Sequence, residues 1–126
     1  MKNQSLHRSK KQLEKEGWKV GITEKWQSFF GRKSRKGTRG VRVDLFNLWD
    51  LVAVKPGEKG VTGVQCCLGN GDKAAHIKKM IANPVLKIWL DAGNPGIIHS
   101  WAKRGKAGKR KLWTCHITHL NHDELP

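Results

Sequence analysis

The sequence predicts an α/β sandwich in which helices pack on a mixed central sheet. Two apolar runs, LVAV at residues 51–54 and VTGV at residues 61–64, are joined by the turn sequence KPGEKG, which is typical of two buried strands in a hairpin. Polar stretches with spaced apolar positions at residues 5–16 and 72–83 indicate helices that cover the sheet. A length of 126 residues suits a single modest core, so we expect residues 1–126 to form one domain.

The first half of the chain is expected to contribute one helix and three strands. Ser5 is a suitable cap for the helix at residues 5–16, and Gly17 is a suitable stop. Residues 18–26 place apolar side chains at alternate positions, as a strand with one buried face does. Beyond them we expect a glycine-rich basic loop and then the two central strands, at residues 27–42, 49–55 and 61–68.

The second half is expected to contribute a helix, a strand and a closing hairpin. Asp72 suits the beginning of the helix at residues 72–83, and Pro84 ends it. The apolar run VLKIWLD at residues 85–91 predicts a further strand. The hairpin is expected over residues 97–120, with strands at 97–103 and 110–120 around the basic loop RGKAGK.

The charge of the chain is strongly positive and unevenly distributed. The sequence has 25 Lys and Arg against 10 Asp and Glu, a net charge of +15. Residues 1–42 carry 13 basic and 3 acidic side chains, residues 43–102 carry 6 and 5, and residues 103–126 carry 6 and 2. Such a field attracts polyanions and predicts nucleic acid as the partner. A charge-solubilised surface is the alternative, and without a basic amphipathic anchor we expect no membrane partner.

Targeting signals and cysteine usage predict the compartment. No apolar run approaches the ~20 residues of a membrane span, and the N-terminal sequence MKNQSLHRSKKQ lacks the apolar region of a signal peptide. Three cysteines, two of them adjacent, favour a reducing environment. We therefore expect a soluble, cytoplasmic protein.

Two polar residues occupy positions where the strand pattern predicts core side chains. Asp50 begins the first central strand, and Gln65 lies late in the next. Because a hairpin makes these strands antiparallel neighbours, the start of one lies beside the end of the other. Their side-chain oxygens, with a backbone carbonyl such as that of Cys66, form an oxygen-rich set that suits Mg²⁺.

At this point the sequence resembles the PD-(D/E)XK, or restriction-endonuclease-like, nuclease superfamily. Its size and its Gly-Trp before the first strand are similar to Holliday-junction resolvases and related small phage nucleases. The residues that carry the resemblance are those at 17–18, 44–46, 49–53 and 64–67, reading GW, DLF, WDLVA and VQCC. The resemblance implies a sandwich of order α-β-β-β-α-β over residues 5–92, to which the hairpin is an addition.

The resemblance also implies roles for individual residues. Asp50 matches the metal-binding aspartate, and Gln65 matches a position that holds Glu or Gln in the family. Cys67 stands where the family has its catalytic lysine, which orients the attacking water or neutralises charge. The resemblance therefore requires a lysine from elsewhere, Lys73 or Lys55, or a protein that binds DNA without cutting it.

Other acids are expected to complete the site. The glutamate of the family's first helix has no counterpart here, and Glu24, at the end of the first strand, is the better substitute. Asp44 is a further ligand from the loop. Each residue also has a purely structural interpretation: a strand-start acceptor for Asp50, a satisfied amide for Gln65, and surface ion pairs for Glu24 and Asp44.

Basic side chains in two segments are expected to hold the nucleic acid. Glycine lets the backbone approach a phosphate, and Lys and Arg contact phosphates without reading sequence. The alternative is two solvated loops. The predicted contacts are Arg32, Lys33, Arg35, Lys36, Arg39 and Arg42 in the loop, and Lys103, Arg104, Lys106, Lys109, Arg110 and Lys111 at the hairpin.

The function expected from these observations is that of a Mg²⁺- or Mn²⁺-dependent DNA endonuclease, of phage or mobile-element origin, acting on duplex or branched DNA. The predicted catalytic set is Asp50, Gln65, Glu24 and Lys73, and the predicted metal ligands are Asp50, Gln65, Cys66 and Asp44. A catalytically inactive DNA-binding protein on the same fold and a small RNA-binding protein are the alternatives. Symmetric cleavage of a junction requires two active sites, which predicts a homodimer.

Overall fold

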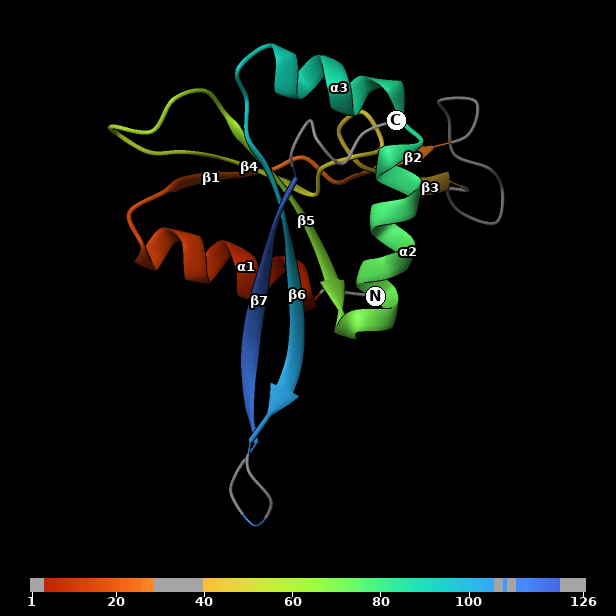
Figure 1. The fold of residues 1–126 in the computed structure, drawn as a ribbon. Helices are drawn as coiled ribbons and strands as arrows, with labels where there is room; N and C mark the ends of the chain where they lie inside the picture. Colours follow the sequence, from red (N-terminus) through yellow and green to blue (C-terminus); the bar gives the residue numbers. More distant parts are fainter. Residues whose placement is uncertain (1–3, 29–39, 106–107, 109–110, 121–126) are drawn as a thin grey trace.

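The described part of the chain forms an α/β structure with three helices and two sheets (Figure 1). The computed structural model describes residues 4–28, 40–105, 108 and 111–120. The elements are α1 (Gln4–Lys15), β1 (Lys19–Ile22), β2 (Lys25–Ser28), β3 (Gly40–Val43), β4 (Leu51–Val54), β5 (Thr62–Leu68), α2 (Gly69–Ile81), α3 (Pro84–Asp91), β6 (Gly96–Arg104) and β7 (Leu112–Leu120).

The larger sheet is mixed and has the strand order β1-β4-β5-β6-β7. β1, β4 and β5 are consecutive antiparallel neighbours, β5 and β6 run parallel, and β7 returns antiparallel to β6. The parallel step is made through α2 and α3, which connect β5 to β6. The mixed sheet, the central pair β4–β5 and the C-terminal hairpin confirm the coarse prediction of an α/β fold.

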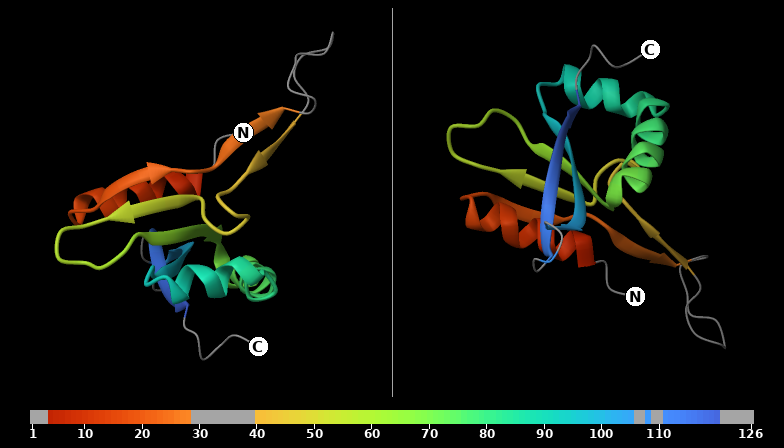
Figure 2. Two further views of the ribbon diagram at one scale, coloured as in Figure 1. Left: turned by 90° about the horizontal axis from the view of Figure 1, so that it is seen from above. Right: turned by 60° about the horizontal axis from the view of Figure 1, so that its bottom comes forward.

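The helices cover opposite faces of the larger sheet (Figure 2). Leu6 and Leu13 of α1 pack in one apolar cluster with Val64 and Cys66 of β5. Met80 of α2 and Leu86 of α3 belong to a second cluster, together with Cys67, Ile98 and Leu120 from the sheet. Successive residues of β5 and β6 thus point into different cores, as the alternation of a strand requires.

The segment expected as one strand at residues 18–26 and the loop that follows it have a different structure. The strand is divided into β1 and β2, with Thr23 and Glu24 between them. β2 pairs with β3 in a two-stranded sheet, in which Lys25 lies opposite Val43 and Ser28 opposite Gly40. The predicted loop at 27–42 is therefore partly strand, and its central residues, 29–39, lie outside the described part of the chain.

The prediction of a strand at residues 85–91 is wrong, because this segment is helix α3. The side chain of Asn83 caps the helix by accepting a hydrogen bond from the N–H of Val85 (2.9 Å), and Pro84 occupies the first turn. Proline is favoured there because its fixed φ suits a helix and its missing N–H has no partner to lose. The strand that follows the helices in the sheet is β6, a segment expected only as half of a hairpin.

Two glycines in neighbouring strands make room for the buried side chain of Trp49. Gly63 of β5 and Gly96 of β6 are register partners in the sheet. A Cβ atom at Gly63 would lie 2.3 Å from the indole of Trp49, and one at Gly96 would lie 2.4 Å from it. The indole thus lies directly on the backbone of two strands and fixes the chain immediately before Asp50.

Among the described residues, no helix is both long enough and apolar enough to cross a membrane.

Candidate metal centre and nucleic-acid interface

The turn between β1 and β2 brings Glu24 to Asp50 through backbone hydrogen bonds. The carbonyl oxygen of Asp50 accepts from the N–H groups of Thr23 (2.9 Å) and Glu24 (3.3 Å). The hydroxyl of Thr23 also donates to the carbonyl of Trp49 (2.6 Å). The break in the predicted strand therefore has a structural role, because it ties Glu24 to the start of β4.

A tight loop over residues 44–49 brings Asp44 to the same place. The N–H of Leu45 donates to the carbonyl of Trp49 (3.1 Å), and the N–H of Trp49 donates back to the carbonyl of Leu45 (3.2 Å). Phe46 and Asn47 both have positive φ, 56° and 59°, a conformation that is uncommon for residues other than glycine. The reversal closes the loop and leaves Asp44 beside Asp50.

The three carboxylates of Glu24, Asp44 and Asp50 form a cluster in which one oxygen from each lies within 4.8 Å of the others. Asp50 is 3% exposed, and its Oδ2 accepts a hydrogen bond from the N–H of Cys66 (3.0 Å). Burial raises the pKa of Asp50 well above its ordinary value, and the hydrogen bond and negative charge of Asp44 raise it further. The cluster therefore favours either a shared proton or a bound cation.

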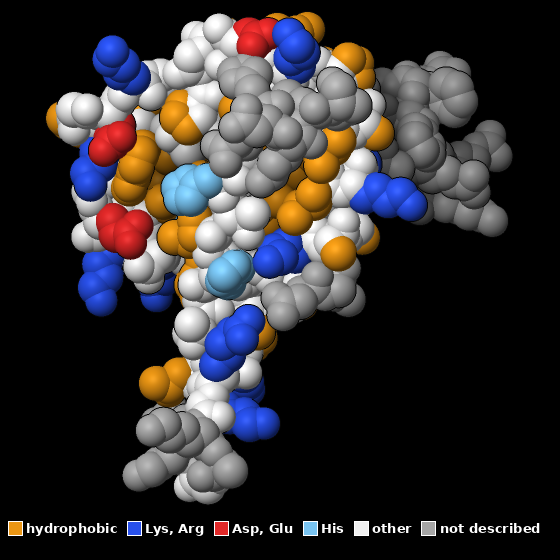
Figure 3. Space-filling view, in the orientation of Figure 1, with side chains coloured by type: hydrophobic (Ala, Val, Ile, Leu, Met, Phe, Trp, Pro, Cys, Tyr) orange, Lys and Arg blue, Asp and Glu red, His pale blue; other side chains and the backbone are white. Residues whose placement is uncertain are grey.

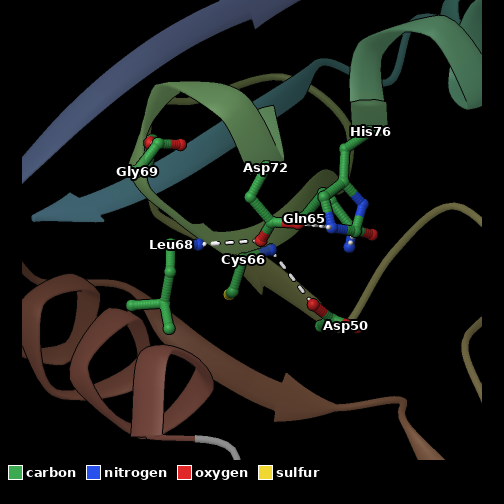
Figure 4. A network of polar contacts seen from close by, with 8 residues as sticks. Asp50, Gln65, Cys66, Leu68, Gly69, Asp72 and His76 are labelled. Carbon is green, nitrogen blue, oxygen red and sulfur yellow. Dashed lines mark hydrogen bonds and ion pairs between the residues drawn. The ribbon is translucent and has the colours of Figure 1, made fainter. Parts of the chain in front are cut away.

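Gln65 faces this cluster from the neighbouring strand. Leu51 of β4 pairs with Val64 of β5, so the residue before Leu51 lies beside the residue after Val64. Gln65 is 5% exposed, and its Nε2 lies 3.1 Å from Nδ1 of His76 on α2 (Figure 4). The predicted meeting of Asp50 and Gln65 at the end of the β4–β5 pair is thus present in the structure.

A cavity of about 320 Å³ opens over these groups. The residues that line it are Ser5, Glu24, Asp44, Asp50, Gln65, Cys66, Cys67, Leu68, Asp72 and His76. Cys66 lies beyond the last residue pair of the β4–β5 ladder, and its N–H is taken by Asp50. Because the N–H and C=O of one strand residue point to the same neighbour, its carbonyl is directed to this edge as well.

The lysine that the family resemblance requires is not among the described residues that line the cavity. Cys67 is 3% exposed, and burial raises the pKa of its thiol, so the side chain is neutral near neutral pH. Lys73, on α2, lies close enough to Cys67 for its charge to oppose that shift, but it does not line the cavity. Lys55 follows the far end of β4, where its ammonium lies 5.6 Å from the ring of Trp18.

His76 and Asp72 are the two ionisable cavity residues that the sequence pattern did not single out as functional. Nε2 of His76 lies 3.6 Å from Oδ1 of Asp72, four residues earlier on α2. Oδ2 of Asp72 accepts a hydrogen bond from the N–H of Leu68 (3.0 Å). An Asp-x-x-x-His pair on the helix directly after the Gln65 strand is the signal that indicates them.

The donor set fits a hard divalent cation. Three carboxylates and a buried amide supply oxygen atoms, and Mg²⁺ and Mn²⁺ prefer oxygen ligands and tolerate retained water. The raised pKa of Asp50 supports the fit, because a bound cation would replace the proton that burial, and after it the neighbouring Asp44, favours on this carboxylate. The predicted ligands Asp50, Asp44 and Gln65 and the predicted catalytic residue Glu24 therefore belong to one site.

The predicted nucleic-acid contacts are described only in part. Lys103, Arg104 and Lys111 are exposed on the hairpin formed by β6 and β7. The hairpin projects beyond the body of the molecule (Figure 1), and blue Lys and Arg side chains line it on the face shown in Figure 3. Of Arg42 only the backbone, in β3, is described. Arg32, Lys33, Arg35, Lys36, Arg39, Lys106, Lys109 and Arg110 lie outside the described residues.

Arg8 and Trp113 extend the basic surface from the hairpin to α1. The guanidinium of Arg8 lies 3.8 Å from the ring centroid of Trp113, and the ammonium of Lys103 lies 5.5 Å from it. Trp113 is 40% exposed. Two cations thus lie close to one partly exposed ring, which adds positive charge that attracts phosphate to this surface.

No protein-family model, curated protein or solved structure matches this chain. The indications of function are therefore the geometry of the cavity and the charge around it. They comprise the carboxylate cluster, the buried amide of Gln65 and the basic hairpin.

Proposed function

We propose that the protein is a metal-dependent DNA endonuclease that hydrolyses phosphodiester bonds, with branched or junction DNA as a candidate substrate. The observation that carries the proposal is the cluster of Glu24, Asp44 and Asp50, which lies beside the buried amide of Gln65 in one cavity. Clustered carboxylates are otherwise unfavourable in a buried site, and a chain of net charge +15 has a strong attraction for DNA.

The order of the core elements supports the resemblance to restriction-endonuclease-like nucleases. With the β2–β3 ribbon and α3 set aside, the chain runs α1, β1, β4, β5, α2, β6, which is the order α-β-β-β-α-β. The strand after the helix is β6 rather than the segment at residues 85–91. Asp50 directly precedes β4 and Gln65 lies in β5, the second and third strands of this order, which supports the motif.

In this proposal Asp50, Asp44, Glu24 and Gln65 hold Mg²⁺ or Mn²⁺. Such an ion, when bound, activates water and stabilises negative charge on a phosphate. The chain's own contribution is to hold the ligands still. The N–H of Cys66 fixes the carboxylate of Asp50, the turn at Thr23 holds Glu24, and the loop closed at Leu45 positions Asp44.

The neutral thiol of Cys67 favours a second candidate function, that of a nuclease-fold protein that binds DNA without cutting it. A buried thiol neither supplies positive charge nor orients water as a lysine does. The basic hairpin and the Arg8–Trp113 contact serve binding whether or not the cavity is catalytic. A small RNA-binding protein is the remaining alternative, because phosphate contacts alone do not distinguish RNA from DNA.

The test is a cleavage and binding assay on labelled duplex, single-stranded and four-way-junction DNA and on RNA, with Mg²⁺, Mn²⁺ or EDTA. Asp50→Ala is the diagnostic variant, and Glu58→Ala, an exposed acid in the turn after β4, is the matched control. The endonuclease predicts cation-dependent cutting that Asp50→Ala abolishes and Glu58→Ala retains. Binding without cutting on every substrate supports the second candidate, and stronger affinity for RNA than for any DNA supports the third.

A further inference from the structure

We propose that His76 is a positioning residue that fixes the amide of Gln65 so that its oxygen, Oε1, faces the carboxylate cluster. This inference rests on the proposed function, because it concerns Gln65 as a cation ligand. It assigns a task to three cavity groups, His76, Asp72 and the N–H of Leu68, that neither the family motif nor the strand pattern explains.

A glutamine ligand has a problem that a glutamate ligand does not have. Only the oxygen end of the amide binds a cation, whereas the NH₂ end is a donor. Beside Glu24, Asp44 and Asp50 the NH₂ end is the one that the carboxylates attract. Without a further contact the amide of Gln65 would therefore turn its nitrogen toward the carboxylates, and the cation site would lose Oε1 as a ligand.

His76 supplies the contact that opposes this rotation. Nδ1 of His76 lies 3.1 Å from Nε2 of Gln65 (Figure 4). When the amide nitrogen donates to the imidazole in this way, Oε1 is the end of the amide that stays available to a cation. Nδ1 accepts a hydrogen bond only when the ring proton is on Nε2. A hydrogen bond that fixes a ligand in this way is the usual task of the groups around a metal site.

Asp72 stabilises the tautomer that this arrangement needs. Its Oδ1 lies 3.6 Å from Nε2 of His76, which favours a proton on that nitrogen. Its Oδ2 is held by the N–H of Leu68 at 3.0 Å. The contacts run from Leu68 at the end of β5 to Asp72 and His76 in the first two turns of α2, and then back to Gln65 on β5. The segment that contains Gln65 therefore also contains the residues that orient it.

Burial makes the orientation persistent. Gln65 is 5% exposed, so bulk water has little access to exchange with the histidine contact. The side chains of His76 and Asp72 are 29% and 48% exposed, so both are reachable from the cavity mouth without being required for the core. Because the side chain of His76 is more exposed than Gln65, we expect its replacement to leave the fold intact.

The test is the affinity of the protein for Mn²⁺ alone, measured by titration calorimetry on a double-mutant cycle. The variants are His76→Ala, Gln65→Glu and the pair together, with Asp50→Ala as the site control. We expect His76→Ala to weaken Mn²⁺ binding about tenfold, the lower end of the effect of removing a ligand's hydrogen-bond partner. When Gln65→Glu is already present, the same change should have little effect, because both ends of a carboxylate are oxygen.

His76→Asn is the rescue variant, because the side-chain oxygen of asparagine can take the place of Nδ1 as an acceptor. It should bind Mn²⁺ with an affinity close to that of wild type, and the unfolding temperature without metal should be similar in all variants that change His76.

If His76→Ala weakens Mn²⁺ binding equally with and without Gln65→Glu, the positioning role is overturned. Unchanged Mn²⁺ affinity in His76→Ala, with binding abolished in Asp50→Ala, would overturn it and leave the proposed function standing. A wild-type protein that binds no Mn²⁺ would overturn both.

Discussion

At the scale of single residues, the cavity is built from groups that are unfavourable in the metal-free fold. Asp50 is buried against Asp44 and Glu24, and burial together with these neighbours raises its pKa. A carboxylate of this kind destabilises the protein at any pH where the unfolded chain would ionise it. Sites that lower stability in this way are commonly functional, which is why the cluster carries the proposed function.

Replacement of Asp50 by asparagine should stabilise the metal-free protein. Asparagine keeps an acceptor for the N–H of Cys66 and removes the ionisable group, so we expect the free energy of unfolding to rise by about 1–2 kcal/mol near neutral pH. Urea unfolding in EDTA measures this. Glu58→Gln is the control and should change stability by no more than about 0.5 kcal/mol. A less stable Asp50→Asn protein would contradict this description of the cluster.

His99 should make the fold sensitive to acid. It is fully buried, its Nδ1 is 2.9 Å from the hydroxyl of Ser9, and burial lowers its pKa from 6.5 to about 4. Since the unfolded chain takes up this proton first as pH falls, stability is lost between the unfolded and folded pKa values, from about 6.5 to about 4. The loss reaches about 3 kcal/mol at most.

The variant His99→Asn, which keeps an acceptor near Ser9, tests whether His99 causes this loss of stability at low pH. Urea unfolding at a series of pH values should show a smaller loss of stability below pH 6.5 in the variant than in wild type. The exposed His116 provides the control, and His116→Asn should follow the wild-type curve. Parallel curves for wild type and His99→Asn would mean that another group causes the acid sensitivity.

At the scale of elements, the short segment from Asp44 to Asp50 determines the geometry of the site. Trp49 lies on the backbone of β5 and β6, and this contact fixes the start of β4. The N–H of Asp50 then donates to the carbonyl of Val64 (2.9 Å), which sets the register of the two central strands. The position of Asp50 in the site therefore depends on the packing of Trp49 against β5 and β6.

A side chain at Gly63 should damage the fold through Trp49. A Cβ atom there would lie 2.3 Å from the buried indole, so Gly63→Ala should cost about 1–3 kcal/mol, as overpacking of a core does. Thermal or urea unfolding measures the cost. Gly21→Ala is the control, because a Cβ atom at Gly21 would lie 3.6 Å from the side chain of Val52. Gly57→Ala is unsuitable because φ at Gly57 is +88°. Equal stability of Gly63→Ala and Gly21→Ala would contradict the packing described for Trp49.

The sequence predicts those elements whose local signals agree with their tertiary environment. The turn KPGEKG between two apolar runs is enough to predict Asp50 beside Gln65. Glu24 is inferred only as a substitute for the family's first-helix glutamate, and Asp44 only as a further ligand from the loop. The strand prediction for residues 85–91 is wrong because a short apolar run suits a buried strand and a buried helix equally. Asn83 and Pro84, a cap and a first-turn proline, are the signals that decide it.

Other features depend on contacts that the sequence does not display. The break at Thr23 and Glu24 exists because both N–H groups turn to the carbonyl of Asp50, a residue 26 or more positions away. His76 looks like a surface residue of an amphipathic helix until its distance from Gln65 is known. The restriction-endonuclease-like fold itself remains a proposal based on element order and motif.

At the scale of the whole molecule, positive charge lies on segments that flank a nearly neutral centre. Residues 92–122 contain no acidic side chain, and this stretch includes both strands of the projecting hairpin. The hairpin and Arg8 form a basic surface, whereas four acids line the cavity, Glu24, Asp44, Asp50 and Asp72. Such a division suits a protein that holds the DNA backbone in one place and a cation in another.

Removal of the hairpin charges should weaken DNA binding and its salt dependence together. A variant with Lys103, Arg104 and Lys111 all changed to Ala should lower the slope of log affinity against log salt by about 3, roughly one for each phosphate that is no longer neutralised. Fluorescence anisotropy on duplex DNA over a salt series measures the slope. A control that removes Lys59, Lys78 and Lys79, three exposed charges elsewhere, should change it less. Equal slopes for the two variants would mean that binding depends on net charge alone.

The assignment of the carboxylate cluster as an active site is tested most simply by the Mg²⁺ requirement of DNA cleavage, with wild type beside Asp50→Ala on four-way-junction DNA. We expect cutting by wild type that begins with added Mg²⁺ or Mn²⁺, stops with EDTA and is absent in the variant at every cation concentration. Cleavage that Asp50→Ala leaves intact, or that continues in EDTA, would contradict that assignment.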